Sequence, residues 1–391
     1  MSKQRTIIVG LDGVPYQLIK DWARQGIMPN TQTLINRGTL RQMRSSIPEV
    51  SAVAWSSIIT GANPAEHGIF GFTDRPTNSD KLTFPNFDDL KAPPFWLQDN
   101  NRKYIIINVP ATYPARALNG LLVSGFVAVD LAKAVYPLHL IEELKEINYK
   151  IDVDTESAHQ SLDVFIEDFG QTLTSHLKAF RYFWQKDWQT FMFVFTEFDR
   201  LAHFLWPALE DAQHQHHSIF INYFQEIDKL IGEVLNNISP GDLLIILSDH
   251  GFERLDQDVY INSLLNPSQA FALDPARIYI KGNDKKTIIN ELETMFNALE
   301  FAGKKVVKRI YHKREIYHGP YLNRAPDLVL SANRGFNLRA GAHRQATFNK
   351  GIINGKHTLE DAFLLINRNV PDSPIPTAPT VYDIVKIIKA G

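Results

Sequence analysis

Three continuous apolar segments in this chain each run into an aspartate. The segments are Thr6–Leu11, Phe191–Thr196 and Asp242–Ser248, and the aspartates that follow them are Asp12, Asp199 and Asp249. Short, continuous runs of apolar and β-branched residues are typical of parallel strands that are covered on both faces. Parallel strands share one carboxyl edge, and open α/β sheets bind their ligands beyond that edge. The sequence therefore predicts an α/β sheet with three carboxylates gathered at one edge.

The segments between these strands predict helices. Tyr104–Val109 is a further buried strand, and apolar residues recur every three or four positions over about 162–184 and 213–237. That spacing is typical of amphipathic helices. Buried strands that alternate with helices predict a doubly wound, mostly parallel central sheet with helices on both faces.

The length of the chain predicts more than this central sheet. Its 391 residues exceed the roughly 250–300 residues at which a single hydrophobic core stops growing. We predict a core over residues 1–255, with a helical insertion at about 130–190. Short strands and one helix over 256–340 predict a smaller inserted α+β subdomain, after which 341–391 return to the core.

Charge and composition narrow the function. The net charge is −2 and no block of like charges occurs, which argues against binding of duplex nucleic acid but leaves a nucleotide-sized ligand open. Cysteine is absent, so any zinc must be bound by histidine and carboxylate ligands. The first strand begins at residue 6 and the apolar runs are of strand length, so we expect a cytoplasmic protein that does not bind membranes. Nothing in the sequence indicates the oligomeric state.

A second feature is the segment PEVSAVAWSSIITGANPAEHGI at residues 48–69. We predict a helix that begins at Ser51 and ends at Gly61, with Ser51 as its N-cap. At that position a hydroxyl either caps the helix or meets a phosphate, because the N–H groups and the dipole of a helix N-terminus attract anions.

Histidines accompany two of the three aspartates. His203 follows Asp199 by one helical turn, and His250 is adjacent to Asp249. Carboxylates that meet without a cation repel one another, and a divalent cation removes that conflict. His343, in a loop, could complete a second site. With Asp12 and Ser51, these residues form two sets of nitrogen and oxygen ligands suited to zinc or manganese.

Five motifs together resemble a known family. They are LDGV at 11–14, the Ser51 segment, TEFDRLAH at 196–203, SDHGF at 248–252 and GAHR at 341–344. In this order they are similar to the metal-ligand motifs of the alkaline phosphatase superfamily. Within it, the chain most resembles prokaryotic members of the type I phosphodiesterase/nucleotide pyrophosphatase family.

The resemblance implies roles for these residues. One divalent cation, Zn2+ or Mn2+, would be held by Asp12, Ser51, Asp249 and His250, and a second by Asp199, His203 and His343. Ser51 takes the position of the nucleophile, which implies a covalent phosphoseryl intermediate on a small phosphate ester, with a nucleotide as one candidate. Metal coordination lowers the pKa of a serine hydroxyl and so activates it without a general base.

Two residues are candidates for substrate contact. We expect nucleotide pyrophosphatases of the eukaryotic type to bind a phosphate oxygen through an asparagine three residues after the nucleophile, where this chain has Ala54. N–H groups at the helix start, or Arg344, could replace it. Trp55 could stack on a base.

The sequence leaves two alternatives to a phosphodiesterase or pyrophosphatase. One is a phosphomonoesterase, or a mutase-like phosphotransferase, of the same superfamily. The other is a protein that retains the metals as a scaffold without catalysis.

Overall fold

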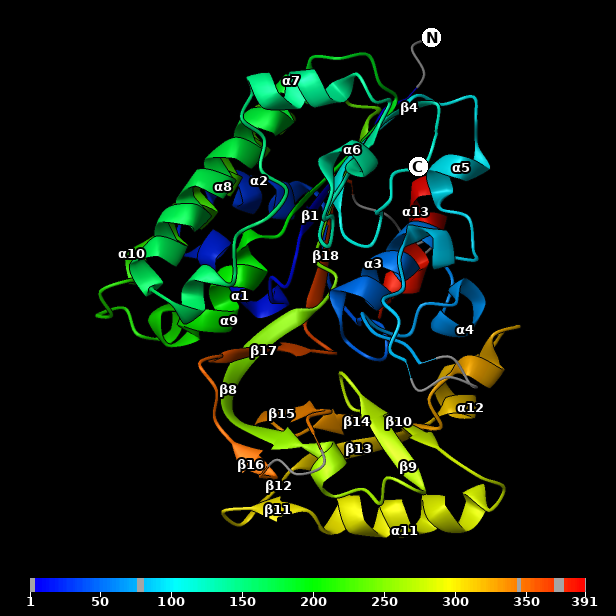
Figure 1. Cartoon of the computed structure of the whole chain (residues 1–391). Helices are drawn as coiled ribbons and strands as arrows, with labels where there is room; N and C mark the ends of the chain where they lie inside the picture. The colour runs from blue at the N-terminus through cyan, green and yellow to red at the C-terminus, as the bar shows by residue number, and fades with distance from the viewer. Residues whose placement is uncertain (1–3, 76–80, 343–345, 369–375, 391) are drawn as a thin grey trace.

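The computed structural model describes residues 4–75, 81–342, 346–368 and 376–390 (Figure 1). Two of the predicted site residues, His343 and Arg344, lie outside the described residues.

An eight-stranded sheet forms the centre of the molecule, in the order β2-β18-β7-β1-β6-β3-β4-β5. Its strands are β1 (Thr6–Leu11), β2 (Thr39–Met43), β3 (Tyr104–Val109), β4 (Gly120–Ser124), β5 (Val135–Tyr136), β6 (Thr190–Phe195), β7 (Leu243–Leu247) and β18 (Ala362–Ile366). Strands β7, β1, β6, β3 and β4 are parallel. Strand β18 is antiparallel to both of its neighbours, and β5 is antiparallel to β4. The predicted mostly parallel sheet is confirmed.

Helices cover both faces of this sheet (Figure 1). One face packs against α1 (Tyr16–Arg24), α2 (Pro29–Arg37), α8 (Leu162–Trp184), α9 (Glu197–Glu210) and α10 (His217–Asn237). The other packs against α3 (Ser51–Thr60), α5 (Phe95–Gln98) and α13 (Ile384–Ala390). Two hydrophobic clusters, one on each face, bury the sheet, as its continuous apolar strands require.

Short helices lie in the connections. They are α4 (Pro64–His67), α6 (Leu131–Ala134), α7 (Leu140–Glu146), α12 (Lys313–Ile316) and the 3₁₀ turns Phe87–Asp89, Ser157–His159, Ile261–Ser263, Leu322–Arg324 and Val381–Asp383. The predicted insertion at 130–190 contains α6, α7 and α8. Helix α8 is the longest of the three, and its apolar stripe packs on the central sheet.

A smaller sheet lies below the central one in Figure 1. It has the order β13-β14-β10-β9, it is antiparallel, and α11 (Lys285–Ala298) packs against it. Its strands are β9 (Ala270–Leu273), β10 (Arg277–Ile280), β13 (Val307–His312) and β14 (Leu328–Ala332). These strands and α11 share a hydrophobic cluster of their own. The domain boundaries that we predict from the sequence stay a prediction.

Strand β8 (Gly251–Tyr260) connects the two sheets (Figure 1). It begins directly after Asp249 and His250 and pairs with β15 (Gly335–Arg339), β16 (Phe348–Asn349) and β17 (Gly355–Thr358). A two-stranded ribbon of β11 (Glu300–Phe301) and β12 (Lys304–Lys305) completes the strands. Among the described residues, no helix has both the length and the apolar character that crossing a membrane demands.

Candidate active site

The three aspartates meet at the carboxyl edge of the central sheet. Asp12 follows β1, Asp249 follows β7, and Asp199 lies in the first turn of α9 after β6. Each carboxylate is almost completely buried, with no more than 1% of the residue exposed. Because β1 pairs in parallel with both β6 and β7, the three strands deliver their aspartates to one place.

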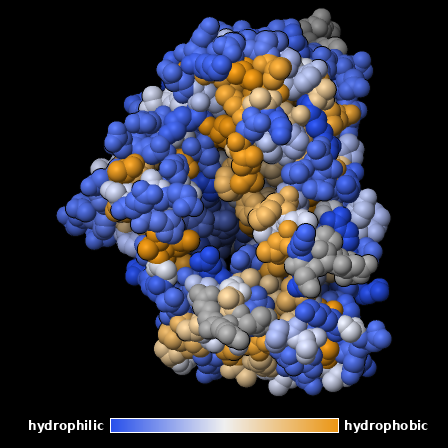
Figure 2. All heavy atoms as spheres, viewed as in Figure 1, coloured by the Kyte–Doolittle hydropathy of each residue, from blue (hydrophilic) through white to orange (hydrophobic). Residues whose placement is uncertain are grey.

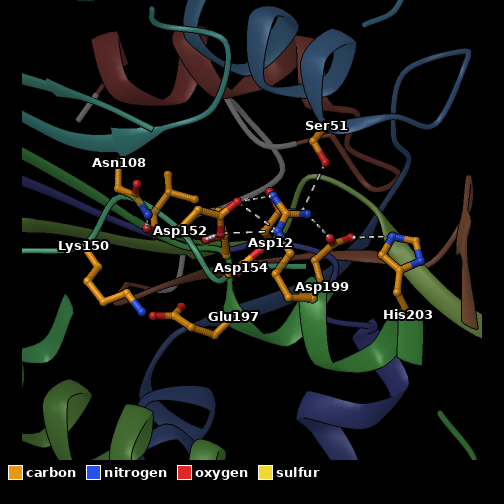
Figure 3. A network of polar contacts seen from close by, with 12 residues as sticks. Asp12, Ser51, Asn108, Lys150, Asp152, Asp154, Glu197, Asp199 and His203 are labelled. Atoms are coloured by element: carbon orange, nitrogen blue, oxygen red, sulfur yellow. Dashed lines mark hydrogen bonds and ion pairs between the residues drawn. The ribbon is translucent and has the colours of Figure 1, made fainter. Parts of the chain in front are cut away.

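Ser51 points its hydroxyl toward this place (Figure 3). Helix α3 begins at Ser51 and ends at Gly61, whose φ of 70° is left-handed. The N-cap, however, is Val50, and no side chain caps the helix. Our prediction of Ser51 as the N-cap is therefore wrong by one residue. The hydroxyl instead lies 3.4 Å from Asp12 Oδ1 and 3.2 Å from His250 Nε2.

We define Asp12, Ser51, Asp249 and His250 as the first cluster. His250 Nε2 lies 3.3 Å from Asp249 Oδ2 and 3.6 Å from Asp12 Oδ1. The second oxygen of Asp12 accepts a hydrogen bond of 2.9 Å from Trp55 Nε1. Trp55 has no exposed surface, so it offers no face on which a base could stack. The structure gives it another role, which is to hold Asp12.

Gly10 makes that role possible. A Cβ atom built on Gly10, in β1, would lie 2.4 Å from the Trp55 ring, closer than van der Waals contact permits. The absence of a side chain at Gly10 lets the ring lie against β1 directly below Asp12.

We define Asp199, His203 and His357 as the second cluster. Asp199 Oδ1 lies 3.0 Å from His357 Nε2 and 3.5 Å from His203 Nε2, and the two Nε2 atoms are 3.0 Å apart. The sequence analysis did not identify His357, which lies on β17. The two clusters touch, because the rings of His250 and His357 stack with their centroids 3.7 Å apart.

The three histidines of the clusters all direct Nε2 toward the carboxylate of Asp199. The Nδ1 atoms of His203, His250 and His357 lie 3.0–3.1 Å from the backbone carbonyls of Gly355, Gly251 and Glu49. A carbonyl oxygen only accepts, so each Nδ1 carries a hydrogen, and the neutral form of each ring presents the lone pair of Nε2. This arrangement is typical of metal-binding histidines, whose other ring nitrogen is held by an oxygen acceptor.

Burial and the charges of neighbouring groups displace the pKa values of the cluster residues from their usual values. Burial raises the pKa of Asp12 well above its usual value, and the carboxylates of Asp249 and Asp199 raise it further. Burial also raises the pKa of Asp249, to about 7. Burial lowers the pKa of His203 to about 4 and that of His250 well below its usual value.

The pKa values of Asp199 and His357 shift in the opposite sense. Burial opposes both shifts, but His203 and Arg200 lower the pKa of Asp199 well below its usual value, and the contact with Asp199 raises the pKa of His357. Buried carboxylates and imidazoles whose pKa values are displaced in this way are ligands that a divalent cation can take over.

The residues present fit such a cation by a second criterion. Asp249 Oδ2 is buried and accepts no hydrogen bond from the described residues. The same holds for Asp199 Oδ1, although three Nε2 atoms lie within 4.0 Å of it. Buried carboxylate oxygens without partners are costly, and ligand atoms that converge without hydrogen bonds are what a metal site requires. Two groups, Asp12 with Asp249 and His250, and Asp199 with His250 and His357, each bring their ligand atoms within 4.8 Å of one another.

Arg200 and Asp152 hold the outer oxygen of Asp199. Arg200 Nη1 donates to Asp199 Oδ2 at 2.5 Å, while its Nε and Nη2 form two hydrogen bonds of 3.0 and 2.8 Å with Asp152 Oδ2. Asp152 also accepts from Thr196 Oγ1. Figure 3 shows Asp199 with His203 on one side and Asp152 on the other. Asp152 comes from the predicted insertion, which thereby reaches the site.

His357 could have been found from the strand order. Strand β18 is antiparallel to β7, so the residues that precede β18 lie at the same edge as those that follow β7. A histidine five residues before a late apolar strand is therefore a candidate for the Asp249 edge. Gly355 allows the approach, because a Cβ atom there would lie 2.3 Å from the Ala202 carbonyl oxygen of α9.

Comparison with solved structures identifies the class of the fold. Phosphonoacetate hydrolase from Sinorhizobium meliloti 1021, in complex with phosphonoformate, aligns with a TM-score of 0.69 and 16% identity over 99% of this chain and 96% of that chain. Murine ectonucleotide pyrophosphatase/phosphodiesterase 5 aligns with a TM-score of 0.62 and 13% identity over 99% and 94%. An inactive variant of the murine protein in complex with AMP aligns with a TM-score of 0.62 and 14% identity over the same shares. At these identities the likeness shows the fold alone, which is that of the alkaline phosphatase superfamily.

The sequence identifies the family. The model of the type I phosphodiesterase / nucleotide pyrophosphatase family matches residues 6–359, so the chain belongs to that family, as its motifs predict. Comparison with curated proteins finds no match. Membership places the chain among the phosphoester hydrolases.

Proposed function

We propose that this protein hydrolyses phosphodiester or pyrophosphate linkages through a covalent phosphoseryl intermediate on Ser51. The observation that carries the proposal is the Ser51 hydroxyl at the start of α3. It caps no helix and lies within 3.4 Å of Asp12 and His250, at the edge where the two clusters meet.

The ligand sets support two divalent cations, zinc or manganese, because their donors are imidazole nitrogens and carboxylate oxygens. Asp12, Ser51, Asp249 and His250 would hold one, and Asp199, His203 and His357 the other, with His357 in the place that we first assigned to His343. Bound cations would lower the pKa of the Ser51 hydroxyl and neutralise charge on the phosphoryl oxygens.

The residues of the chain carry the reaction in two displacements. Ser51 Oγ loses its proton to solvent and forms a bond to phosphorus as the bond from phosphorus to the leaving oxygen breaks. N–H groups in the first turn of α3 donate to a phosphoryl oxygen. Water then attacks phosphorus and the Ser51 Oγ–P bond breaks, which restores the serine and releases the phosphate product. Both displacements take place at a buried edge where preorganised groups act strongly.

The substrate is a small phosphate ester, and a nucleotide is one candidate. The structural neighbours support this range, since one holds phosphonoformate and another holds AMP. Arg344 remains a candidate for contact with the phosphate.

The test compares bis-p-nitrophenyl phosphate with p-nitrophenyl phosphate, on protein stripped by chelator and reloaded with zinc or manganese. We expect faster cleavage of the diester, loss of activity on chelation, and a fall of about a thousandfold or more in kcat for Ser51→Ala. Ser56→Ala is the matched control, because Ser56 is buried in the same helix and its hydroxyl donates only to Ala52 O.

Other results would change the assignment. Faster monoester cleavage would favour the phosphomonoesterase or phosphotransferase. Equal activity in Ser51→Ala and the parent protein would exclude the phosphoseryl route. No turnover of either ester by metal-loaded protein, together with no effect of Ser51→Ala, would favour the non-catalytic scaffold.

A further inference from the structure

A cavity of about 350 Å³ lies between the central sheet and the smaller sheet, and it reaches His203 and His357 of the second cluster. Val50 and Phe72 form its wall on the core side, and Leu330 and Ala332 of β14 form part of the opposite wall. Phe336 and Leu338 of β15 extend that wall. In Figure 2 the surface is hollowed where the upper and lower parts of the molecule meet, and hydrophobic side chains gather along the upper rim of the hollow.

The position of this cavity decides which part of a substrate could enter it. Ser51 Oγ contacts Asp12 and His250 of the first cluster, and it forms no hydrogen bond with the second cluster among the described residues. In an in-line displacement the leaving oxygen lies opposite the attacking oxygen. With the attacking oxygen at the first cluster, the leaving oxygen lies toward the second, where the cavity begins.

The charges in the cavity do not suit an anionic leaving group. Among the described residues, four charged side chains line it, two acidic and two basic: Glu49, Asp274, Arg339 and Lys356. Lys356 is engaged by Glu253 at 2.9 Å. The remaining lining is mostly apolar. Beyond the end of the cavity where His203 and His357 would hold a cation, a pyrophosphate group would lose its hydration without a surplus of positive charge from the described lining, which is costly. An apolar ring or short chain would gain from burial there.

A larger cavity, of about 980 Å³, lies elsewhere between the two parts and is lined by Lys285, Lys313 and Arg324. It contains no residue of either cluster. Among the described residues, its five cationic side chains are also engaged: Lys285 and Lys313 pair with Asp327, Arg324 pairs with Asp74, and Arg75 and Lys281 lie over the Phe271 ring. The smaller cavity is therefore the one in a position to receive the leaving group.

We propose that the cavity between β14, β15 and residues 48–50 and 72–73 selects phosphoesters whose leaving alcohol is compact, uncharged and apolar. This inference rests on the proposed function and narrows it: the favoured substrates are esters of aromatic or short aliphatic alcohols, and nucleoside triphosphates, which release pyrophosphate, are disfavoured. A volume of about 350 Å³ lies at the lower end of the roughly 300–1,000 Å³ of ligand pockets, so one ring or a short chain fills it.

The experiment compares two methyl phosphodiesters, one with phenol and one with 4-hydroxybenzenesulfonate as the leaving alcohol. The sulfonate is the better leaving group chemically, so a preference for phenyl cannot come from intrinsic reactivity. We expect kcat/KM to favour the phenyl ester by about tenfold to a hundredfold, because the cost of desolvating the sulfonate opposes burial of the ring that carries it. Equal rates, or a preference for the sulfonate, would overturn the proposal.

A pair of variants locates the effect. Leu330 and Ala332 line the cavity and also pack in the hydrophobic cluster of the smaller sheet, whereas Ser331, between them on β14, is not part of the cavity lining. Ala332→Trp should lower kcat/KM for the phenyl ester about tenfold and Ser331→Trp should leave it near the parent value. Equal losses in both variants would place the selectivity elsewhere. If Ala332→Trp fails to fold, the ratio of the two esters in the parent protein decides.

Binding gives a readout that does not require turnover. Calorimetric titration of metal-loaded Ser51→Ala with phenylphosphonate and methylphosphonate should give tighter binding of the phenyl compound, and Ala332→Trp should remove the difference. Inactivity on both esters, together with tighter binding of phenylphosphonate than of methylphosphonate, would count against the proposed function and would support the proposed selectivity of the cavity. Activity without any difference in binding or rate would count against the cavity alone.

Discussion

The edge of the central sheet and the smaller sheet contribute to the site in different ways. At the edge, six of the seven cluster residues are held by a hydrogen-bond partner outside the clusters: Asp12 by Trp55, Asp199 by Arg200, Asp249 by the Gly13 N–H, and the three histidines by backbone carbonyls. The smaller sheet supplies no residue to either cluster; its β14 contributes an apolar wall to the cavity. It also has its own hydrophobic cluster.

This difference separates chemistry from selectivity. The edge residues are polar, buried and mutually dependent, so a change in one disturbs the others. The wall residues are apolar and stand on a sheet with a separate core, so they can change without disturbing the clusters. We therefore expect substitutions at the edge to abolish turnover and substitutions in the smaller sheet to alter which ester is cleaved or how stable the protein is.

The largest expected effect on activity tests whether His357 or His343 is the third ligand of the second cation. His357→Ala should lower kcat by at least about a hundredfold, more than the 10–100-fold typical of residues outside the ligand shell. It should also reduce the zinc bound per chain after equilibrium dialysis, because Asp199 and His203 would lose a neighbour within 3.0 Å of each.

His343→Ala should bind as much zinc as the parent protein. His312→Ala is a further control, since His312 of β13 pairs with Glu293 of α11 and belongs to neither cluster. If His343→Ala loses zinc and His357→Ala does not, His357 is not a ligand of the second cation. The third ligand is then His343, as the sequence motif implies.

A smaller effect tests whether the insertion belongs functionally to the edge. Asp152→Asn should weaken the two hydrogen bonds that orient Arg200, and with them the hold on Asp199 Oδ2. We expect kcat to fall about 10–100-fold with little change in KM or melting temperature, because Asp152 does not reach the cavity.

Asp154→Asn is the matched control. Asp154 lies two residues further along the same segment, is exposed, and accepts from the Glu156 N–H without contacting Arg200. If the melting temperature of Asp152→Asn falls so far that loss of folded protein accounts for its lower kcat, Asp152 acts by stabilising the fold. Equal kcat values for both variants would show that Asp152, and with it the insertion, has no role in turnover.

The central sheet was predictable because its signal is local. Strands β1 and β3 have the predicted bounds, and the three aspartates follow buried strands as predicted. Continuous apolar runs identify such strands without knowledge of their partners. Helix α3 begins at Ser51 as predicted, but its N-cap is Val50, because the ends of helices are the least certain part of an assignment.

The elements that escaped prediction depend on distant partners. Strand β8, with the sequence GFERLDQDVY, has charged residues and no continuous apolar run. Strand β17 is four residues long, and His357 reaches its place only because β17 pairs with β8 in the register His357 to Phe252. Pairing across about a hundred residues leaves no local trace in the sequence, so the motif around His343 was the better signal available.

The smallest effect concerns the smaller sheet and should leave the chemistry unchanged. Asp327 is nearly buried and accepts hydrogen bonds from Lys285, Lys313 and the Ile280 N–H. Burial raises its pKa, but these donors outweigh burial and lower the pKa below the usual value. A pKa lower in the folded than in the unfolded state stabilises the fold above the unfolded value, which is about 4, and that stabilisation is lost as the pH falls through the folded value.

Asp327→Asn should therefore destabilise the protein by about 1–2 kcal/mol near pH 7, seen as a lower midpoint of urea unfolding. The difference from the parent protein should shrink below about pH 4. Asp256→Asn, which breaks an exposed pair with Arg254, should change the midpoint little at either pH. Turnover of the phenyl ester per folded molecule should be the same in all three proteins. A loss of kcat in Asp327→Asn that exceeds the loss of folded protein would mean that the smaller sheet acts on the chemistry itself, and the separation between the two regions would fail.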